Sequence, residues 1–411
     1  MENGTSIISK GFKDFLWRYI RKLNLKNCTV NITPATVRGD NHLGVVVKVE
    51  VKSENSNYNW ILKCAIDDET FRFYFPLTHA FEREVYMYTK VLLEYERLQK
   101  EKGILSPFKS FTKLYTFSLT PPYECVVLED LKALGYVLQD RRQPLDYNHV
   151  LMIMKEYGRF HALSFALRDQ KPSVFKEIAE NTKDMYYNNL HYVEPIVNAF
   201  KTVENRALNT LDPVAHKSVY KKFSQFKERV YMIIQEIIKP EASGVYSVIT
   251  HGDCWTNNFL FKYSNCEYPN APTEMCFIDW QLSRLCSPVF DLSYFLFTCT
   301  DKQFRDKYYD EMINEYYDSL SSFLLELGSD SKKLFPFSVL KDHLKLFSVF
   351  GLFMSIQSLY SSLSEHGEVP YFLKKSEEKV KQTSTHTDTY SVRIKDVILD
   401  FEKLGYNFHI M

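Results

Sequence analysis

The chain has 411 residues, of which 45% are hydrophobic and 25% are charged, the balance of a globular protein with a large core. Its 51 basic and 51 acidic residues cancel, so no overall field draws the chain to nucleic acid or to an anionic membrane. This length suits a two-lobed enzyme or two to three ordinary domains.

Neither the cysteines nor the apolar segments indicate secretion or membrane insertion. The eight cysteines include no C-x-x-C pair, and reduced thiols are expected in a chain of this size. The first residues mix charged and apolar side chains and lack the apolar run of a secretory signal. The most apolar stretch, 346–360, is shorter than the roughly 18 residues that span a bilayer, so it predicts a buried helix. We expect a cytoplasmic protein with no membrane span and no obligate protein partner.

The front third of the chain is rich in strand patterns. Apolar residues at helical spacing predict a helix over 6–25, and residues 37–51 read as a turn cluster feeding a valine-rich strand. A second strand is predicted over 58–66. Residues 80–98 have the pattern of a strong amphipathic helix. A buried strand is predicted within 123–131, where it ends in two acidic residues.

After residue 131 the pattern becomes mostly helical. Helical spacing runs from 287 to the end and through three earlier segments, 146–167, 175–200 and 218–238. Residues 249–263 and 274–281 predict a short strand–loop–strand interruption. The polar stretch 374–391 reads as a loop or a solvated helix end.

The interruption contains a loop that concentrates polar side chains, "ITHGDCWTNNFLFKY". Asp253 and Asn258 stand five positions apart between apolar runs, and Asp279 ends the next apolar strand. Glycine, aspartate and asparagine favour turns by themselves, so an ordinary surface loop is one explanation. A hairpin between the two strands would instead gather all three polar side chains. Carboxylate and amide oxygens suit Mg²⁺, which keeps waters and substrate phosphates at its other positions.

The motifs H-G-D-x-W-x-x-N-x-L-F, I-D-W-Q and P-x-x-D-L, in this order, resemble those of the aminoglycoside and choline kinases. More narrowly, they resemble the ecdysteroid kinase-like, or CHK kinase-like, proteins. The other expected parts also occur in order: Lys63 in "WILKCAI", Glu84 in "FEREVYMY", "VVLEDL" at 126–131 and "GRFHALSFAL" at 158–167. Each part alone is a weak signal, but the ordered combination is strong and covers nearly the whole chain.

The resemblance implies an α+β, two-lobed protein kinase-like fold. A small β-sheet lobe with one main helix would occupy residues 1–130 and bind nucleotide. A large, mostly helical lobe would occupy 131–411 and carry the catalytic loop and the acceptor site. The hinge between the lobes would lie at about 126–131.

The resemblance also implies roles in phosphoryl transfer, in which positioning and charge neutralisation dominate. Asp253 would orient the acceptor hydroxyl and accept its proton. Asn258 and Asp279 would hold Mg²⁺ against the phosphates of ATP. Lys63 would contact those phosphates, with Glu84 holding it in place. The alternatives are that Lys63 is a surface lysine and that Glu84 is one charge on a solvated helix face.

The nucleotide loop "RGDNHLG", at 38–44, lacks the G-x-G-x-x-G pattern. It resembles the shorter turn of this family, in which the backbone at Asn41 and Gly44 could cradle phosphate. Adenine would bond the backbone of Glu129 and Leu131. The motifs H-R-D, D-F-G and A-P-E are missing, which favours a small-molecule kinase over a regulated protein kinase.

Two further residues are expected to support the loop rather than react. His251 would brace it by hydrogen bonding instead of binding metal. Asp291 would act as a helix cap or loop brace. The roles of Trp255 and Asn257 remain open.

The predicted activity is ATP- and Mg²⁺-dependent phosphorylation of a small hydroxylated molecule, with no nucleic acid involved. Choline would require an aromatic and acidic cage, an aminoglycoside an acidic cleft, and a steroid a large apolar cavity. The many phenylalanines and tyrosines, and the resemblance, favour a lipophilic acceptor such as an ecdysteroid-type steroid or a xenobiotic alcohol or phenol.

Two hypotheses from other classes compete with this one. A metallohydrolase would use His251, Asp253 and Asp279, but it needs further ligands and leaves Lys63 and Glu84 without a role. A non-catalytic pseudokinase would bind nucleotide or a lipophile. The joint presence of the lysine, the asparagine and both aspartates argues against it.

Overall fold

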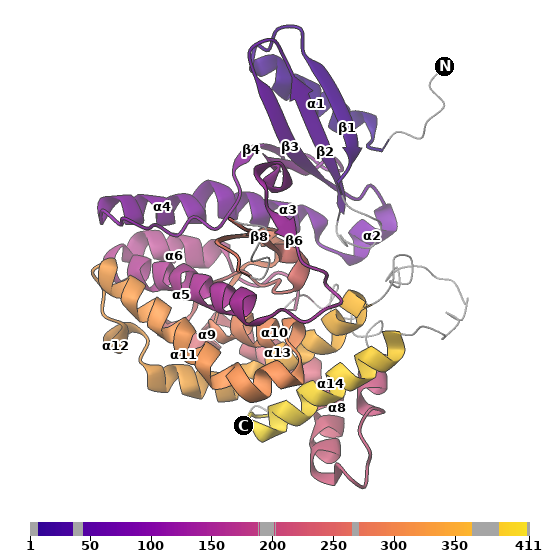
Figure 1. The fold of residues 1–411 in the computed structure, drawn as a ribbon, viewed down its shortest axis with the longest axis vertical. Coiled ribbons are helices and arrows are strands. Elements are labelled where there is room, and N and C mark those ends of the chain that lie inside the picture. Colours follow the sequence, from indigo (N-terminus) through magenta and orange to yellow (C-terminus); the bar gives the residue numbers. More distant parts are fainter. Residues whose placement is uncertain are drawn as a thin grey trace.

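The fold is described from a computed structural model. The structure describes residues 7–35, 44–187, 189, 201, 203–264, 271–363 and 386–408. A small lobe built around a β-sheet stands on a larger, mostly helical body (Figure 1). This is the expected α+β, two-lobed kinase-like arrangement.

The small lobe is an antiparallel sheet of five strands in the order β1-β2-β3-β5-β4. The strands are β1 Thr29–Pro34, β2 Gly44–Lys52, β3 Asn57–Ala65, β4 Leu114–Ser118 and β5 Cys125–Glu129. Helix α1, Lys10–Lys22, buries Phe12, Leu16 and Ile20 in one cluster with valines of β2 and with Trp60 of β3. One face of the sheet therefore has its own small core.

The main helix of this lobe is interrupted, whereas the sequence pattern predicts one continuous helix. Helix α3, Leu77–Tyr86, passes through a π-helical turn, η1 Met87–Val91, into α4, Leu92–Glu101. A short helix, α2 Glu69–Tyr74, precedes it. Val85, Tyr88 and Tyr95 of this main helix pack into the same core as the helices of the large lobe. The main helix therefore packs with the body although it precedes the hinge in sequence.

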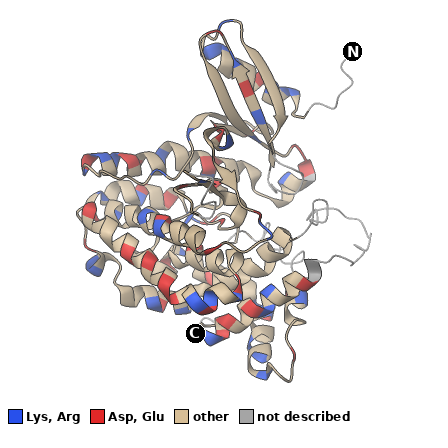
Figure 2. Cartoon of the chain, in the orientation of Figure 1, with Lys and Arg blue, Asp and Glu red and all other residues tan. Residues whose placement is uncertain are grey.

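The large lobe is built from long helices around a buried central one, α5 Tyr147–Gln170. Within the described residues, the other helices are α6 Pro172–Asn181, α8 Lys217–Ile237, α10 Val289–Cys299, α11 Lys302–Glu326, α13 Phe337–Leu363 and α14 His386–Lys403, with two four-residue helices, α9 Pro240–Ser243 and α12 Ser331–Leu334. Lysine, arginine, aspartate and glutamate residues of both signs are interspersed along these helices (Figure 2). The predicted helical segments 146–167 and 218–238 are confirmed. Parts of 175–200 and of 374–391 lie outside the described residues.

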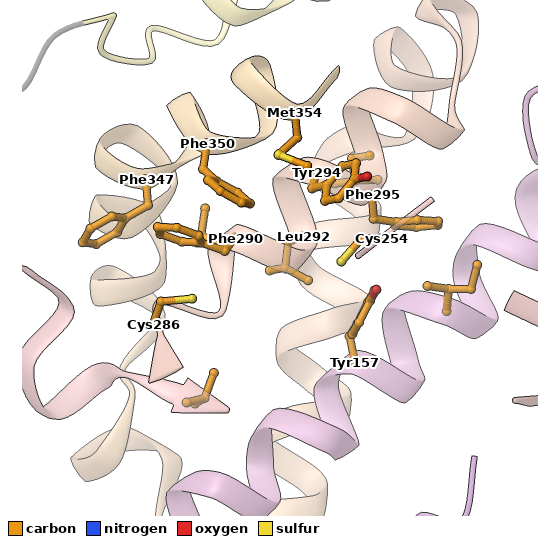
Figure 3. Packing of buried hydrophobic residues seen from close by; sticks show 14 of the residues in the cluster. Tyr157, Cys254, Cys286, Phe290, Leu292, Tyr294, Phe295, Phe347, Phe350 and Met354 are labelled. Atoms are coloured by element: carbon orange, nitrogen blue, oxygen red, sulfur yellow. The ribbon is translucent and has the colours of Figure 1, made fainter. Parts of the chain in front are cut away.

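The apolar stretch 346–360 lies inside α13, which packs along α10. Phe290 of α10 stacks on Phe350 of α13 with ring centroids 4.3 Å apart, and Phe347 and Met354 extend the contact (Figure 3). A Cβ at Gly351 would overlap the backbone of Ser293, so the two helices approach closely. By length and composition α13 could cross a membrane, but 78% of its apolar window is buried inside the fold.

The predicted interruption forms two small sheets between the helices. Strand β8, Phe259–Lys262, pairs with β9, Glu274–Phe277, and with β6, Val137–Leu138. Strand β7, Val248–Thr250, pairs with β10, Arg284–Cys286. The hairpin expected between the two site segments is therefore present. Two 3₁₀ turns, η4 Thr256–Asn258 and η5 Trp280–Leu282, follow the polar loop and β9.

Candidate active site

The polar loop between β7 and β8 is shaped by Gly252. This residue has φ +86°, and a Cβ on it would overlap the carbonyl oxygen of Leu282 in the η5 turn. Only glycine adopts this conformation without strain and also leaves room for that oxygen. The loop therefore lies directly against the segment that follows Asp279.

Asp291, in the first turn of α10, anchors the loop from below. Its carboxylate accepts the backbone N–H of His251 at 2.7 Å and that of Gly252 at 2.9 Å. His161 of α5 lies 3.1 Å from the same carboxylate through its Nε2. Burial tends to raise the pKa of Asp291, but the contact with His161 and the loop amides outweigh it and lower the pKa. These contacts place Asp291 where the predicted loop brace would lie.

His251 links the loop to the strand that carries Asp279. Its Nε2 lies 2.9 Å from the carbonyl oxygen of Ile278, and its Nδ1 lies 3.3 Å from the backbone nitrogen of Asp253. These contacts place the proton on Nε2 and leave Nδ1 as the acceptor. Burial lowers the pKa of His251, so the ring is neutral at pH 7.

The carboxylate of Asp253 is surrounded by donors. Asn258 Nδ2 donates at 2.7 Å and Trp255 Nε1 at 3.2 Å to Oδ2, and the Tyr294 hydroxyl donates at 3.1 Å to Oδ1. Burial, followed by the charge of Asp279, raises the pKa of Asp253 to about 6. Near neutral pH the group is a fixed carboxylate whose proton affinity exceeds that of an ordinary aspartate.

Asn258 and Asp279 end adjacent strands of the hairpin, and the backbone N–H of Ile278 donates to the carbonyl of Asn258 at 3.1 Å. Asn258 Nδ2 donates to both the backbone and the carboxylate of Asp253, which leaves Oδ1 as the acceptor end of the amide. An amide oxygen and a carboxylate are hard oxygen donors that fit Mg²⁺.

The same donor set does not fit a hydrolytic metal centre. Within the described part of the chain, no group of three or more histidine, cysteine or acidic side chains could hold a metal by itself. Such a cluster is what the metallohydrolase hypothesis requires. A Mg²⁺ ion at Asn258 and Asp279 would depend on waters and phosphate oxygens for its other ligands.

Lys63 of β3 is held between two carboxylates. Its Nζ lies 3.0 Å from Glu84 Oε2 of α3 and 2.7 Å from Asp279 Oδ1. Burial opposes the charged lysine, but Asp279 and Glu84 raise its pKa. Burial is also the largest influence on Glu84 and raises its pKa. With 5% of Lys63 and none of Glu84 exposed, the surface-lysine and solvated-helix alternatives are wrong.

The predicted nucleotide contacts are only partly within the described residues. Asn41 lies outside them, and Gly44 begins β2, where a Cβ would meet the carbonyl oxygen of Cys64. The N–H of Glu129 donates to Lys113 and the carbonyl of Leu131 accepts from Tyr136. The carbonyl of Glu129 also accepts from the Thr112 hydroxyl at 3.2 Å, so the adenine contacts of these two residues stay a prediction.

Sequence reasoning missed an apolar cluster beside this segment. Leu131 packs with Leu260 of β8 and Cys276 of β9, and Ile278 joins them. These side chains lie between the hinge and the strands that lead to Asn258 and Asp279. The alternation along β8 and β9 gave a signal, since Leu260 points away from Phe259 and Phe261.

Sequence reasoning also missed two residues, on α10 and α3, that contact the site from outside the loop motif. Tyr294 lies one turn after Asp291 on α10, and its hydroxyl contacts Ser358 of α13 at 2.8 Å as well as Asp253. The three-residue spacing from Asp291 places both side chains on one helix face and was the available signal. Arg83, next to Glu84, is the second missed residue.

Comparisons with known proteins identify a family and several distant structural neighbours. Residues 38–329 match the ecdysteroid kinase-like family, and no curated protein matches the chain. Plasmodium vivax ethanolamine kinase is 14% identical, with a TM-score of 0.45 and coverage of 98% of this chain and 97% of that one. A spectinomycin phosphotransferase with ADP and spectinomycin is 14% identical, with a TM-score of 0.37 and coverage of 92% and 98%. An aminoglycoside 2′-phosphotransferase with GDP is 9% identical, with a TM-score of 0.42 and coverage of 95% and 98%. Because the matched region spans most of its length, this chain belongs to the ecdysteroid kinase-like family.

Proposed function

We propose that this protein is an ATP- and Mg²⁺-dependent kinase that phosphorylates a hydroxyl group of a small lipophilic molecule. The observation that carries the proposal is the cluster of Lys63, Asp253, Asn258 and Asp279, in which Lys63 and Asn258 are buried and the two aspartates are partly exposed. It combines a fixed cation, a carboxylate with raised proton affinity and two oxygen donors for a metal.

The residues divide the work of phosphoryl transfer. ATP with Mg²⁺ supplies the phosphoryl group and part of the charge neutralisation when bound. Lys63 binds phosphate oxygens, and Glu84 keeps its ammonium in place. Asp253 accepts the proton of the acceptor O–H as the new O–P bond forms, and the bond between the γ-phosphorus and the leaving oxygen breaks. Asn258 fixes the orientation of the Asp253 carboxylate.

The aromatic side chains around Tyr294, which contacts Asp253 and Phe350, support an uncharged acceptor. Tyr187 contacts Met354 through its hydroxyl and Phe353 through its ring, which makes this side aromatic. The buried guanidinium of Arg284 lies 5.6 Å from the ring centre of Tyr187 and 5.7 Å from that of Phe350. A quaternary ammonium such as that of choline would need these aromatic faces, which the Arg284 guanidinium already occupies. This supports a steroid-type or xenobiotic alcohol or phenol over choline.

The test is ATP consumption against panels of steroid alcohols, phenols, choline or ethanolamine, and aminoglycosides, with phosphorylated product identified by mass spectrometry. Turnover is expected with steroid alcohols or phenols. Asp253→Asn should lower it by about 10²-fold or more, because the general base is lost. Equal turnover of this variant and the wild type would contradict the mechanism. Binding of Mg-ATP without product in any panel would favour the pseudokinase alternative.

We also propose a cytoplasmic location. The seven cysteines that the structure describes are free thiols, and most of them are buried. Free thiols are typical of reducing compartments.

A further inference from the structure

Arg83 forms a contact between the nucleotide side of the site and the large lobe. It lies on α3 immediately before Glu84 and is 7% exposed. Its guanidinium donates to the carbonyl of Ser283 and, at 2.8 Å, to the carbonyl of Lys183. One planar group thus binds two backbone segments that are 100 residues apart in sequence.

The first of these segments carries the metal-side carboxylate. Ser283 follows the η5 turn, which begins directly after Asp279. The hydroxyl of Ser283 donates to the carbonyl of His251 at 3.2 Å. Arg83 therefore fixes α3 to the Asp279 turn directly, and to the catalytic loop through one further hydrogen bond.

The second segment, residues 182–187, lies against β10 and α13. The carbonyl of Thr182 accepts from Leu285 at 2.8 Å, and Asp184 pairs with Arg284 at 3.3 Å in a buried contact. The carboxylate of Asp184 also accepts the backbone N–H of Tyr187 at 2.7 Å. The ring of Tyr187 packs on Phe353 with centroids 5.8 Å apart.

Tyr187 also lies within the electrostatic reach of Asp253. Burial raises the pKa of Tyr187, Arg284 lowers it, and the charges of Asp184 and Asp253 raise it further. The Arg83 guanidinium thus lies at one end of a continuous set of contacts. The Tyr187 side chain, packed against Phe353 and Met354 of α13, lies at the other end.

We propose that Arg83 is a positioning residue that couples nucleotide binding at Lys63 and Glu84 to the order of the acceptor-side segment 182–187. The inference rests on the proposed kinase function and adds a specific coupling to it. Arg83 holds α3 at a fixed distance from the Asp279 turn, so Glu84 and Asp279 meet Lys63 together. A ligand that binds Lys63 then changes the contacts of Glu84 on α3, and the Arg83 guanidinium passes that change to residues 182–187.

The two carbonyl contacts of residue 83 require an arginine, and a positive charge alone would not make both. The guanidinium presents its donors in a rigid planar fork and reaches two carbonyls at once, whereas lysine places one ammonium on a flexible stem. Arg83→Lys should keep the charge and lose the double contact. Arg83→Met should keep most of the apolar stem and lose both hydrogen bonds.

Arg72 provides a matched control. It also donates to backbone carbonyls, those of Ile66 at 2.9 Å and Pro122 at 2.7 Å, and to the carboxylate of Glu124. All of these acceptors precede the hinge, so Arg72 joins nothing to the large lobe. Arg72→Met should cost stability and leave the coupling intact.

The experiment measures the dissociation constant of Mg-ATP by calorimetry, and amide hydrogen exchange of residues 182–187 with and without Mg-ATP, in the full chain. In the wild type and in Arg72→Met, Mg-ATP should slow exchange in this segment. In Arg83→Met it should bind about tenfold or more weakly and leave the exchange of this segment unchanged. Arg83→Lys should fall between them, and it decides the question if Arg83→Met does not fold.

Two outcomes overturn the inference in distinguishable ways. If the wild type binds Mg-ATP and both Arg83 variants retain its affinity and the same protection of 182–187, Arg83 is only a structural residue. If the wild type itself fails to bind Mg-ATP, the proposed function fails, and the coupling fails with it.

Discussion

Tyr294 donates a hydrogen bond to Asp253 from a helix that the loop motif does not include, and this bond lowers the pKa of the carboxyl against the effect of burial. A hydrogen bond to a charged acceptor contributes about 1.5–3 kcal/mol, and one pKa unit corresponds to about 1.4 kcal/mol. Tyr294→Phe removes a donor that stabilises the carboxylate, so the pKa of Asp253 should rise by about one unit above its present value of about 6. The base works only when deprotonated, so the acidic limb of the kcat/KM profile should move to higher pH.

The control for that profile is Tyr309→Phe. Tyr309 is also buried and hydrogen-bonded, to Tyr406 at 2.9 Å, but it lies on α11 away from the carboxylate. The pH profile of kcat/KM of Tyr309→Phe should coincide with that of the wild type. An unchanged acidic limb in Tyr294→Phe would show that this hydroxyl does not tune the base.

Asp291 should matter more for stability than an ordinary helix-capping aspartate. It is fully buried and accepts two loop amides, so Asp291→Asn replaces an acceptor with a donor facing an N–H. The free energy of unfolding at pH 7 should fall by about 2–4 kcal/mol, as it does when buried charge-assisted bonds are broken. Asp301→Asn, which alters the single amide contact that caps α11, should cost about 1 kcal/mol or less. Chemical denaturation measures both, and equal losses would contradict the role of Asp291 as an anchor.

At the scale of elements, the loop and the η5 turn should behave as one packed unit. Gly252 and Gly103 both have positive φ, but only at Gly252 would a Cβ overlap a backbone atom. Gly103→Ala should cost about 1 kcal/mol from backbone strain alone. Gly252→Ala should cost at least about 2 kcal/mol more, because a backbone clash is added. Comparison of the two denaturation midpoints tests this, and matching midpoints would show that the loop can move away from the turn.

Sequence patterns predicted elements with buried apolar residues well and half-exposed strands poorly. The helix from Asp146 onward and the β8–β9 hairpin were predicted because their apolar residues are strongly patterned or their turn residues are distinctive. Strands β1 and β4 were missed, since neither contains a fully buried residue. The π-turn inside the main helix was missed because five residues do not disturb the helical period detectably.

The candidate site divides in the same way. Residues inside the loop motif, such as Asp253 and Asn258, were predicted because they lie close together in one short segment of the sequence. Arg83 and Tyr294 were not found, since their contacts join residues 200 and 41 positions apart. Only the packing of α3 and α10 against the loop brings such groups together, and no local pattern encodes that packing.

At the scale of the molecule, the hydrophobic core does not follow the proposed boundary at residues 130 and 131. One face of the sheet forms a cluster with α1, whereas Ala65, Val126 and Leu128 of its other face join the main helix α3–α4 in the core of the large lobe. Lys63 lies on β3, and its partners are Glu84 of α3 and Asp279 after β9. The ion pairs of Lys63 therefore connect the sheet to α3 and to the large lobe.

A ligand that contacts both the sheet and the large lobe should stabilise the whole chain. Saturating Mg-ATP at about 100 times its dissociation constant adds about 2.7 kcal/mol, so the thermal midpoint should rise by several degrees. Removal of the metal with EDTA should abolish most of that rise, because the charge of the phosphates would then face Asp279 uncompensated. Asp279→Asn should lose the metal-dependent part of the shift, whereas Asp301→Asn should keep it. A shift that is the same with EDTA as with Mg²⁺ would exclude Asn258 and Asp279 as the metal site and leave Lys63 as the main phosphate contact.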